Sequence, residues 1–243
     1  MLSILKSEWY KLRKSKVFII LLTGPLVGLA AGIGADTSET AGMVNEWYML
    51  LIYMNLPYAV LFLPLMTGVL ASLVCRYEHQ AGGWKQLLAL PVTRGKVFAA
   101  KYLLVLLLVM MIQLLYLAAI YSAGMFKGVA DPFPIEIIWK SILGGWVATF
   151  PLVALQLWMS VWFKSFAAPF AVNVIFTLPA ILAMNSEKAG PYYPWAQPFA
   201  MMYPAANTDD LFFIPWEQLL TVIGGFFLLF YLGGYLYFQR KAV

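Results

Sequence analysis

The residues best suited to chemistry gather in one stretch, residues 75–101, which reads CRYEHQAGGWKQLLALPVTRGKVFAAK. It holds the only histidine and the only cysteine of the chain, a pair of glycines and several cations. One histidine and one cysteine supply too few ligands for a metal cluster. The sequence also has no GxxxxGK(S/T) phosphate loop, no HExxH and no GxSxG motif. We therefore predict no catalytic or metal site, and expect this stretch to recognise another molecule.

The elements around this stretch are strongly apolar. Hydrophobic residues make up 63% of the chain and charged residues only 11%, far below the charged share of a soluble domain. The apolar residues form six stretches near the length that crosses a bilayer, at 17–35, 51–74, 99–123, 137–163, 169–184 and 215–238. They show no strand-like alternation, so we predict an all-α polytopic membrane protein with six transmembrane helices, of which the fifth is short.

The lysines and arginines are distributed unevenly between the two sides that these spans define. Only Lys127, Lys140 and Lys188 fall on one side. The other lysines and arginines all fall on the opposite side: before the first span, in the loop at 75–101, at position 164 and in the C-terminal tail. This asymmetry predicts that both termini and that loop are cytoplasmic. A cleaved signal peptide would explain the basic start and first apolar run, but it would leave five spans and spoil the charge pattern.

Two cytoplasmic segments have helical periodicity. Residues 1–16 are predicted to form an interfacial amphipathic helix, the alternative being a plain charged flank. In the loop, an apolar face is predicted to join Tyr77, Ala81, Trp84 and Leu88 in one short helix, which Gly82–Gly83 weakens and Pro91 ends. A surface helix on lipid headgroups would show the same pattern.

Neutral polar residues interrupt the predicted spans. They either line a substrate route or form hydrogen bonds between helices. The candidates for the route are Asn55, Thr67, Gln156, Asn173 and Thr177. On the outer side, a loop at 185–214 is rich in aromatic residues and prolines, as expected of an interfacial anchor or of a segment that meets a ligand.

The loop also resembles a known family. Glu78, Gly82, the run LLALPVTRGK at 87–96 and Lys101 resemble the cytoplasmic loop of ABC-2 type permeases, the membrane subunits of one class of ABC transporter. The resemblance covers the whole chain, treated as a single domain (1–243) with an interfacial helix (1–16), a coupling loop (75–97) and an outer loop (185–214). The chain length and PWAQP at 194–198 look most like permeases of lantibiotic self-immunity and bacitracin resistance.

The resemblance implies a coupling helix between spans two and three that docks on an ATPase. The residues expected at or beside this contact are Glu78, Gly82, Trp84, Leu87, Leu88, Pro91 and Arg94. In this interpretation Glu78 pairs with a cation of the partner, Trp84 and Leu88 fill an apolar groove, and Arg94 meets acidic or carbonyl groups. The alternative is that Arg94 and Lys96 hold the loop to lipid phosphate.

The predicted function is therefore that of a permease subunit in an ABC exporter in a bacterial cell membrane. The chain itself needs no cofactor, because ATP and Mg²⁺ would be bound by separate ATPase subunits. Its other expected partners are a second permease chain, the lipid bilayer and an amphipathic or peptide antibiotic, and no nucleic acid, because its cations lie next to the spans. The alternatives are another substrate (sodium, a drug or a polysaccharide), a non-transporting sensor or interaction protein, and a polytopic lipid enzyme.

Overall fold

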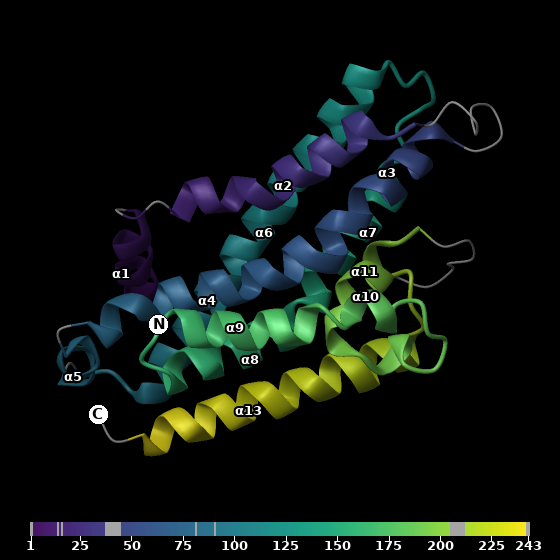
Figure 1. Cartoon of the computed structure of the whole chain (residues 1–243). Coiled ribbons are helices and arrows are strands. Elements are labelled where there is room, and N and C mark those ends of the chain that lie inside the picture. Colours follow the sequence, from purple (N-terminus) through teal and green to yellow (C-terminus); the bar gives the residue numbers. More distant parts are fainter. Residues whose placement is uncertain are drawn as a thin grey trace.

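The computed structural model describes residues 2–13, 15, 17–36, 45–80, 82–89, 91–204 and 212–241. These residues form a bundle of long helices and contain no strand, which confirms the all-helical prediction (Figure 1). α1, α5 and both ends of the chain lie at one end of the bundle, called here the inner end (Figure 1). The elements in chain order are α1 (Leu2–Arg13), α2 (Val17–Gly34), α3 (Glu46–Pro57), η2 (Tyr58–Phe62), α4 (Leu63–His79), α5 (Gly83–Ala89), α6 (Arg94–Lys127), α7 (Ile135–Ala148), α8 (Phe150–Trp162), α9 (Ala167–Thr177), α10 (Ala180–Ala183), η3 (Gly190–Tyr192), η4 (Pro194–Ala196), α11 (Gln197–Met202), α12 (Trp216–Gln218), η5 (Leu219–Gly224) and α13 (Gly225–Arg240).

Within the described residues, five helices are long and apolar enough to cross a membrane. They are Val17–Gly34, Glu46–His79, Arg94–Lys127, Ile135–Trp162 and Trp216–Arg240, and they match the first four predicted spans and the last. The predicted fifth span falls in a shorter apolar helix, Ala167–Ala183. The structure thus confirms a multi-pass helical protein, while the sixth span stays a prediction.

Prolines account for irregularities in two of the long helices. Pro57 lies at the end of α3 and is followed by the π-helical turn η2. Pro151 lies in the first turn of α8, just after Thr149, where the regular hydrogen bonding of the helix is interrupted between α7 and α8. A proline has no amide hydrogen to donate, so the helical ladder must open or shift beside it, which membrane helices tolerate.

The 34-residue helix α6 packs against most of the other long helices. It begins at Thr93, whose hydroxyl accepts a hydrogen bond from the amide of Lys96, and ends at Gly128 with φ +71°. Small residues bring neighbouring helices close to it: a Cβ on Gly28 of α2 would lie 2.5 Å from the ring of Tyr116. Such close approach is the main source of helix association in lipid, where apolar burial alone drives little.

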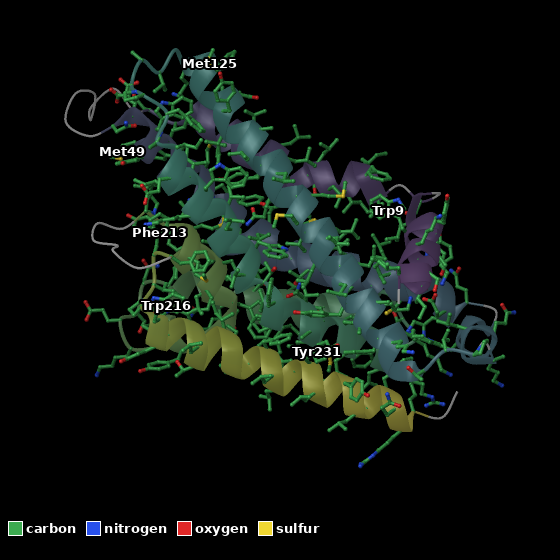
Figure 2. All side chains as sticks on the ribbon, turned by 180° about the vertical axis from the view of Figure 1, so that it is seen from behind. Trp9, Met49, Met125, Phe213, Trp216 and Tyr231 are labelled. Atoms are coloured by element: carbon green, nitrogen blue, oxygen red, sulfur yellow. The ribbon has the colours of Figure 1, made fainter. Side chains whose placement is uncertain are left out.

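The outside of the bundle is apolar. Leu228, Leu229, Leu232 and Leu236 are each more than half exposed along α13. Aromatic residues mark both ends of the bundle: Trp9 lies at the inner end and Trp216 at the other (Figure 2). An apolar surface with aromatic residues near its two ends is typical of contact with a bilayer.

The predicted continuous helix across residues 77–88 is wrong. α4 extends from the bundle to His79, and a separate helix, α5, starts at Gly83. Gly82 adopts φ +72°, a left-handed conformation that side chains with a Cβ rarely take. A Cβ on Gly83 would lie 2.7 Å from the backbone oxygen of Tyr77. The two glycines therefore form a tight corner between two helices, and Ala81, predicted on the shared face, lies outside the described residues.

Candidate functional site

α5 is held against the inner end of the bundle by its apolar side. Trp84 is 5% exposed, and its ring centroid lies 5.1 Å from that of Phe238 in α13. The Trp84 indole nitrogen donates to Nδ1 of His79 over 3.3 Å. Lys85 and Gln86 are exposed on the other side of α5. The surface that α5 offers to another molecule is consequently its polar side.

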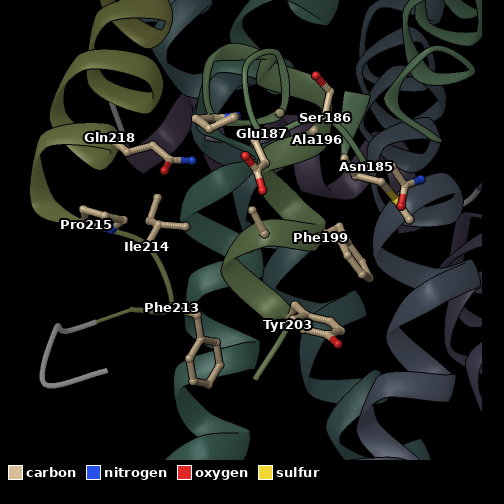
Figure 3. Close-up of a pocket in the computed structure, with 14 residues that line it drawn as sticks. Asn185, Ser186, Glu187, Ala196, Phe199, Tyr203, Phe213, Ile214, Pro215 and Gln218 are labelled. Atoms are coloured by element: carbon tan, nitrogen blue, oxygen red, sulfur yellow. The ribbon is translucent and has the colours of Figure 1, made fainter. Parts of the chain in front are cut away.

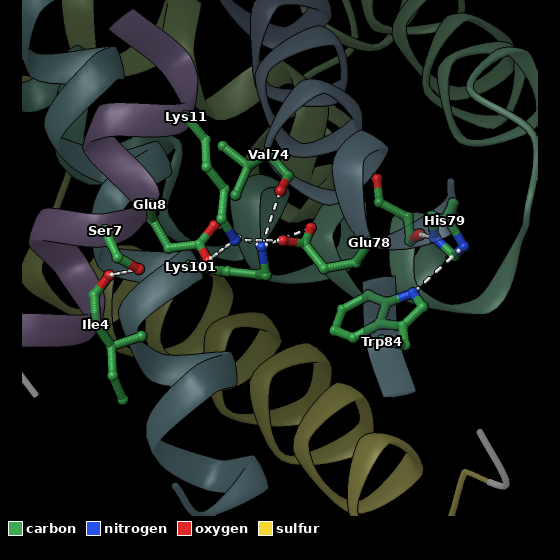
Figure 4. A network of polar contacts seen from close by, with 10 residues as sticks. Ile4, Ser7, Glu8, Lys11, Val74, Glu78, His79, Trp84 and Lys101 are labelled. Carbon is green, nitrogen blue, oxygen red and sulfur yellow. Dashed lines mark hydrogen bonds and ion pairs between the residues drawn. The ribbon is translucent and has the colours of Figure 1, made fainter. Parts of the chain in front are cut away.

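Four charged side chains form a closed ring of ion pairs beside α5 (Figure 4). Nζ of Lys101 lies 2.7 Å from Oε2 of Glu8 and 2.9 Å from Oε2 of Glu78. Nζ of Lys11 lies 2.6 Å from Oε1 of Glu8 and 2.7 Å from Oε1 of Glu78. Lys101 also donates to the carbonyl of Val74 over 2.8 Å. We call Glu8, Lys11, Glu78 and Lys101 the ion ring; it ties together α1, α4 and α6.

Burial makes the ion ring a rigid joint. The side chains of Lys101, Glu8 and Glu78 are 1–2% exposed, and only Lys11 reaches solvent, at 32%. Two positive and two negative charges cancel inside the ring. Removal of one partner from a buried ion pair leaves an uncompensated charge, at a cost of about 3–5 kcal/mol. The inner ends of α1, α4 and α6 are therefore expected to move together.

The sequence-based interpretation of Glu78 and Trp84 differs from what the structure shows. Glu78 was expected to pair with a cation of a partner, but its carboxylate is bound to Lys101 and Lys11 of the same chain. Trp84 was expected to fill a partner's groove, but its ring packs inside the chain. The sequence signal for the ion ring is the presence of Glu8 and Glu78 among many cations on one side. Helical spacing pairs Glu8 with Lys11, but no local spacing brings Glu78 or Lys101 to them.

Arg94 fastens the start of α6 to the end of α13. Its Nη1 donates to the carbonyls of Phe238, Gln239 and Lys241 over 3.2, 3.0 and 2.6 Å. The last carbonyls of a helix have no partner within it, and they carry partial negative charge. The carbonyl groups that Arg94 meets therefore belong to its own chain, and its contact with a partner stays a prediction.

The remaining residues of the predicted ATPase contact lie on or beside α5. Gly82 forms the corner before it, Leu87 is half-buried against the core, and Pro91 follows its end. Leu88 belongs to α5, but its side chain lies outside the described part of the chain. Contact of this region with an ATPase stays a prediction, for which the structure offers Lys85 and Gln86 as exposed residues.

The polar residues predicted for a substrate route are fully buried and, with one exception, hydrogen-bonded. The Asn55 amide donates to the carbonyl of Met202 over 2.7 Å, and its oxygen accepts from the Tyr116 hydroxyl over 2.8 Å. The Asn173 amide donates to the carbonyl of Pro64, and its oxygen accepts from the indole of Trp195. Thr67 donates to the Pro64 carbonyl and Thr177 to the Asn173 oxygen. The bonds of Asn55 and Asn173 join different elements of the bundle, as the alternative of hydrogen bonds between helices predicts, whereas those of Thr67 and Thr177 stay within one helix.

Gln156 is the exception. It is buried in α8, and neither its side-chain nitrogen nor its oxygen has a hydrogen-bond partner among the described residues. A buried amide without a partner costs about 1–3 kcal/mol. Gln156 is therefore the predicted route residue whose burial the described packing does not explain.

The predicted outer loop folds back into the bundle instead of resting on its surface. Its first part forms η3, η4 and α11, and α11 packs against α7. Trp195 is 4% exposed and Met202 is fully buried. The Gln197 amide donates to the carbonyls of Gly190, Pro191 and Tyr193 and holds this fold together. Residues 205–211 of the predicted loop lie outside the described residues.

A cavity of about 530 Å³ opens beside α11 at the outer end of the bundle (Figure 3). Its walls are mainly apolar and aromatic, with Phe199, Tyr203, Phe213 and Ile214 among them. The Glu187 carboxylate and the Gln218 amide project into it (Figure 3). None of the predicted route residues lines this cavity. Its chemistry suits an apolar molecule that carries a cation or hydrogen-bond donors.

Several long apolar helices, with a short helix between the second and third of them, are the features of a multi-pass membrane protein. The model of the ABC-2 family transporter proteins matches residues 4–180, more than half of the chain. The chain belongs to this family, so it is a membrane subunit of the permease kind, located in the cytoplasmic membrane.

One characterised relative supports the predicted branch. Over 162 residues, 65% of this chain and 72% of the relative, the chain is 26% identical to the bacitracin transport permease protein BCRB of Bacillus licheniformis. The predicted similarity to bacitracin-resistance permeases is confirmed. No solved structure matches the chain.

Proposed function

We propose that this protein is the permease subunit of an ABC exporter that expels an amphipathic or peptide antibiotic, such as bacitracin or a lantibiotic, from the membrane. ATP and Mg²⁺ are bound by separate ATPase subunits, and a second permease chain, identical or homologous, completes the transporter. The observation that carries the proposal is the position of α5, a helix fixed between two spans with a polar side exposed, in a chain related to a bacitracin permease.

The proposed topology has six spans with both termini and α5 in the cytoplasm. The inner end of the bundle contains both chain ends and α5 (Figure 1), which agrees with the distribution of the cations. The fifth span would be Ala167–Ala183. At 1.5 Å per residue a helix of this length extends roughly 25 Å, which crosses a locally thinned bilayer.

The ion ring provides a route for the ATPase to move the bundle. α5 joins α4 through the corner at Gly82, and Glu78 lies in the last turn of α4. Because the ion ring links Glu78 to α1 and α6, a displacement of α5 is transmitted to the inner ends of three helices. Nucleotide and substrate then shift the population between inward and outward conformations, provided that each binds the two conformations with different affinity.

The cavity at the outer end is the proposed place where cargo leaves. A cargo that enters sideways from lipid needs no charged path through the bundle, and apart from the ion ring the buried polar residues of the described spans are neutral. At the outer end it would meet an aromatic wall and the Glu187 carboxylate. This arrangement favours a cationic amphipath over a bare ion such as sodium.

The proposal is tested by deletion of the permease gene and by co-expression of the protein with an ABC ATPase of the same organism. Cells that lack the permease gene should become sensitive to bacitracin or to a lantibiotic and not to sodium, and restoration of the gene should reverse this sensitivity.

The coupling role of α5 is tested by charge reversal. Lys85→Glu should reduce drug-stimulated ATP hydrolysis by about tenfold, because it reverses the charge on the exposed side of α5, whereas the matched Lys6→Glu on α1 should not. Sensitivity only to sodium or to an unrelated drug would overturn the substrate assignment. Normal ATPase recruitment and activity in Lys85→Glu would contradict the coupling role of α5.

A further inference from the structure

A second, smaller cavity lies at the inner end of the bundle, between α4, α8 and the start of α9. Its volume is about 140 Å³, room for roughly four groups the size of a water molecule. It is lined by Ser72, Arg76, His79, Ser160, Lys164 and Ser165, among others. We call it the inner cation pocket, after the cationic side chains of Arg76 and Lys164 that line it. It is separate from α5 and from the outer cavity, and the proposed export does not use it.

The floor of the inner cation pocket is a fixed polar surface. Ser72 and Ser160 are 4% and 2% exposed, and their hydroxyl oxygens lie 3.3 Å apart across the contact between α4 and α8. Nε2 of His79 lies 2.6 Å from the carbonyl oxygen of Ser160. These bonds hold α4 against α8 at this point, so the pocket keeps its shape.

The mouth of the pocket is positively charged. Arg76 and Lys164 are exposed there, and in the described part of the chain no carboxylate lies within ion-pair distance of either. The nearest acid on α4, Glu78, is bound in the ion ring. Lys241 lies close by and donates to the carbonyl of Val161; burial lowers its pKa, and so does the charge of Lys164. α9 also begins at this mouth, with the positive end of its dipole.

The surroundings of the pocket indicate a membrane ligand. Phe166, which is 44% exposed, and Pro169 form part of its lining. Trp162 and Phe163, which are 51% and 36% exposed, directly precede Lys164 in the chain. Exposed aromatic rings next to cations are typical of the depth of lipid headgroups. A phosphate in the pocket would therefore have apolar surface beside it for an attached acyl chain.

We propose that the inner cation pocket binds the phosphate group of an anionic membrane phospholipid, with Arg76 and Lys164 as its charged ligands and the hydroxyls of Ser72, Ser160 and Ser165 at its floor. A bound lipid would join α4, α8 and α9, whereas the ion ring joins α4 to α1 and α6. The proposal does not depend on which cargo the protein exports.

The test is a titration of the purified full-length protein with phosphatidylglycerol, with bound lipid counted by native mass spectrometry. Arg76→Gln with Lys164→Gln should weaken binding about tenfold or more, since each cation near a membrane surface contributes to the attraction for anionic lipid. The matched control is Lys6→Gln with Lys96→Gln, which removes the same charge from exposed positions outside the pocket. Arg76→Lys with Lys164→Arg keeps the charges and should keep the affinity.

A second arm of the experiment distinguishes a lipid headgroup from free inorganic phosphate as the ligand of the pocket. The same variants are placed in phosphatidylcholine nanodiscs, and the shift in thermal unfolding with inorganic phosphate is measured. Loss of phosphatidylglycerol binding in the pocket variant alone supports the lipid. Loss of the response to inorganic phosphate with unchanged phosphatidylglycerol binding overturns the lipid in favour of a free anion. Equal behaviour of the pocket and control variants in both arms overturns the site.

Discussion

Lys101 of α6 holds Glu78 of α4 through Nζ and Oε2 at 2.9 Å, one turn before the corner from which α5 emerges. Lys101 at the same time binds Glu8 of α1. A single buried ammonium thus connects the interfacial segment, the second predicted span and the third. This relationship connects the loop that carries α5 to three helices, which is the connection that the proposed coupling requires.

Replacement of Lys101 by Met should destabilise the protein by about 3–5 kcal/mol, because Glu8 and Glu78 would face each other with only the half-exposed Lys11 between them. Thermal unfolding in detergent measures the effect. The triple change Lys101→Met, Glu8→Gln and Glu78→Gln should recover much of the loss, because it leaves no buried charge unpaired. A Lys101→Met protein as stable as the parent would show that the ion ring is not a joint.

Gly82→Ala should cost about 1–2 kcal/mol and displace α5, because alanine at φ +72° is strained. Gly34→Ala is the matched control: a Cβ there meets no atom within 4 Å, and its φ is not in the left-handed region. We expect drug-stimulated ATP hydrolysis to fall in Gly82→Ala and to be unchanged in Gly34→Ala. Equal activity of the two variants would mean that the corner does not set the position of α5.

Gln156→Met should raise the free energy of unfolding by about 1 kcal/mol, since it replaces a buried amide without a partner by an apolar side chain of similar length. Asn173→Leu should lower the free energy of unfolding, because the Trp195 indole and the Pro64 carbonyl would lose their hydrogen-bond partner. Antibiotic resistance of cells carrying each variant then tests the predicted route. A more stable Gln156→Met protein that no longer exports would support Gln156 as a substrate ligand, and full export would remove it from the route.

Glu187→Gln should reduce resistance to a cationic peptide antibiotic several-fold while leaving thermal stability unchanged, because the carboxylate lines the outer cavity and is exposed. Glu136→Gln, an exposed acid in the first turn of α7, is the control. The minimum inhibitory concentrations of a cationic and of an uncharged antibiotic are compared. If both variants lose resistance equally, or if the loss is the same for the uncharged drug, Glu187 does not select the charge of the cargo.

The elements of this protein could largely be predicted because their signals are local. Thr93 before α6 and Pro91 after α5 mark helix boundaries, and continuous apolar stretches mark five of the spans. The apolar run of the fifth predicted span is short, and it corresponds to a shorter apolar helix, Ala167–Ala183. The corner at Gly82 was missed because a glycine that weakens a helix and one that ends it in a left-handed turn look alike in sequence.

The site was predicted less well, because the partners of its residues are distant along the chain. Glu8 and Glu78, or Arg94 and Phe238, come together only when the helices pack. Trp84 seemed available to another protein because its face of the helix is apolar, and the packing of α13 occupies that face.

By itself, the sequence determined that the chain is helical, lies in a membrane and has an asymmetric distribution of charge, because each depends on composition and on residues a few positions apart. Only the tertiary structure decided which charges are paired inside and which are free to meet a ligand. A buried ion pair such as Lys101 and Glu78 and an exposed cation such as Lys164 use the same kinds of residue. What distinguishes them is the removal of water by neighbouring helices, and that depends on the packing of the whole bundle.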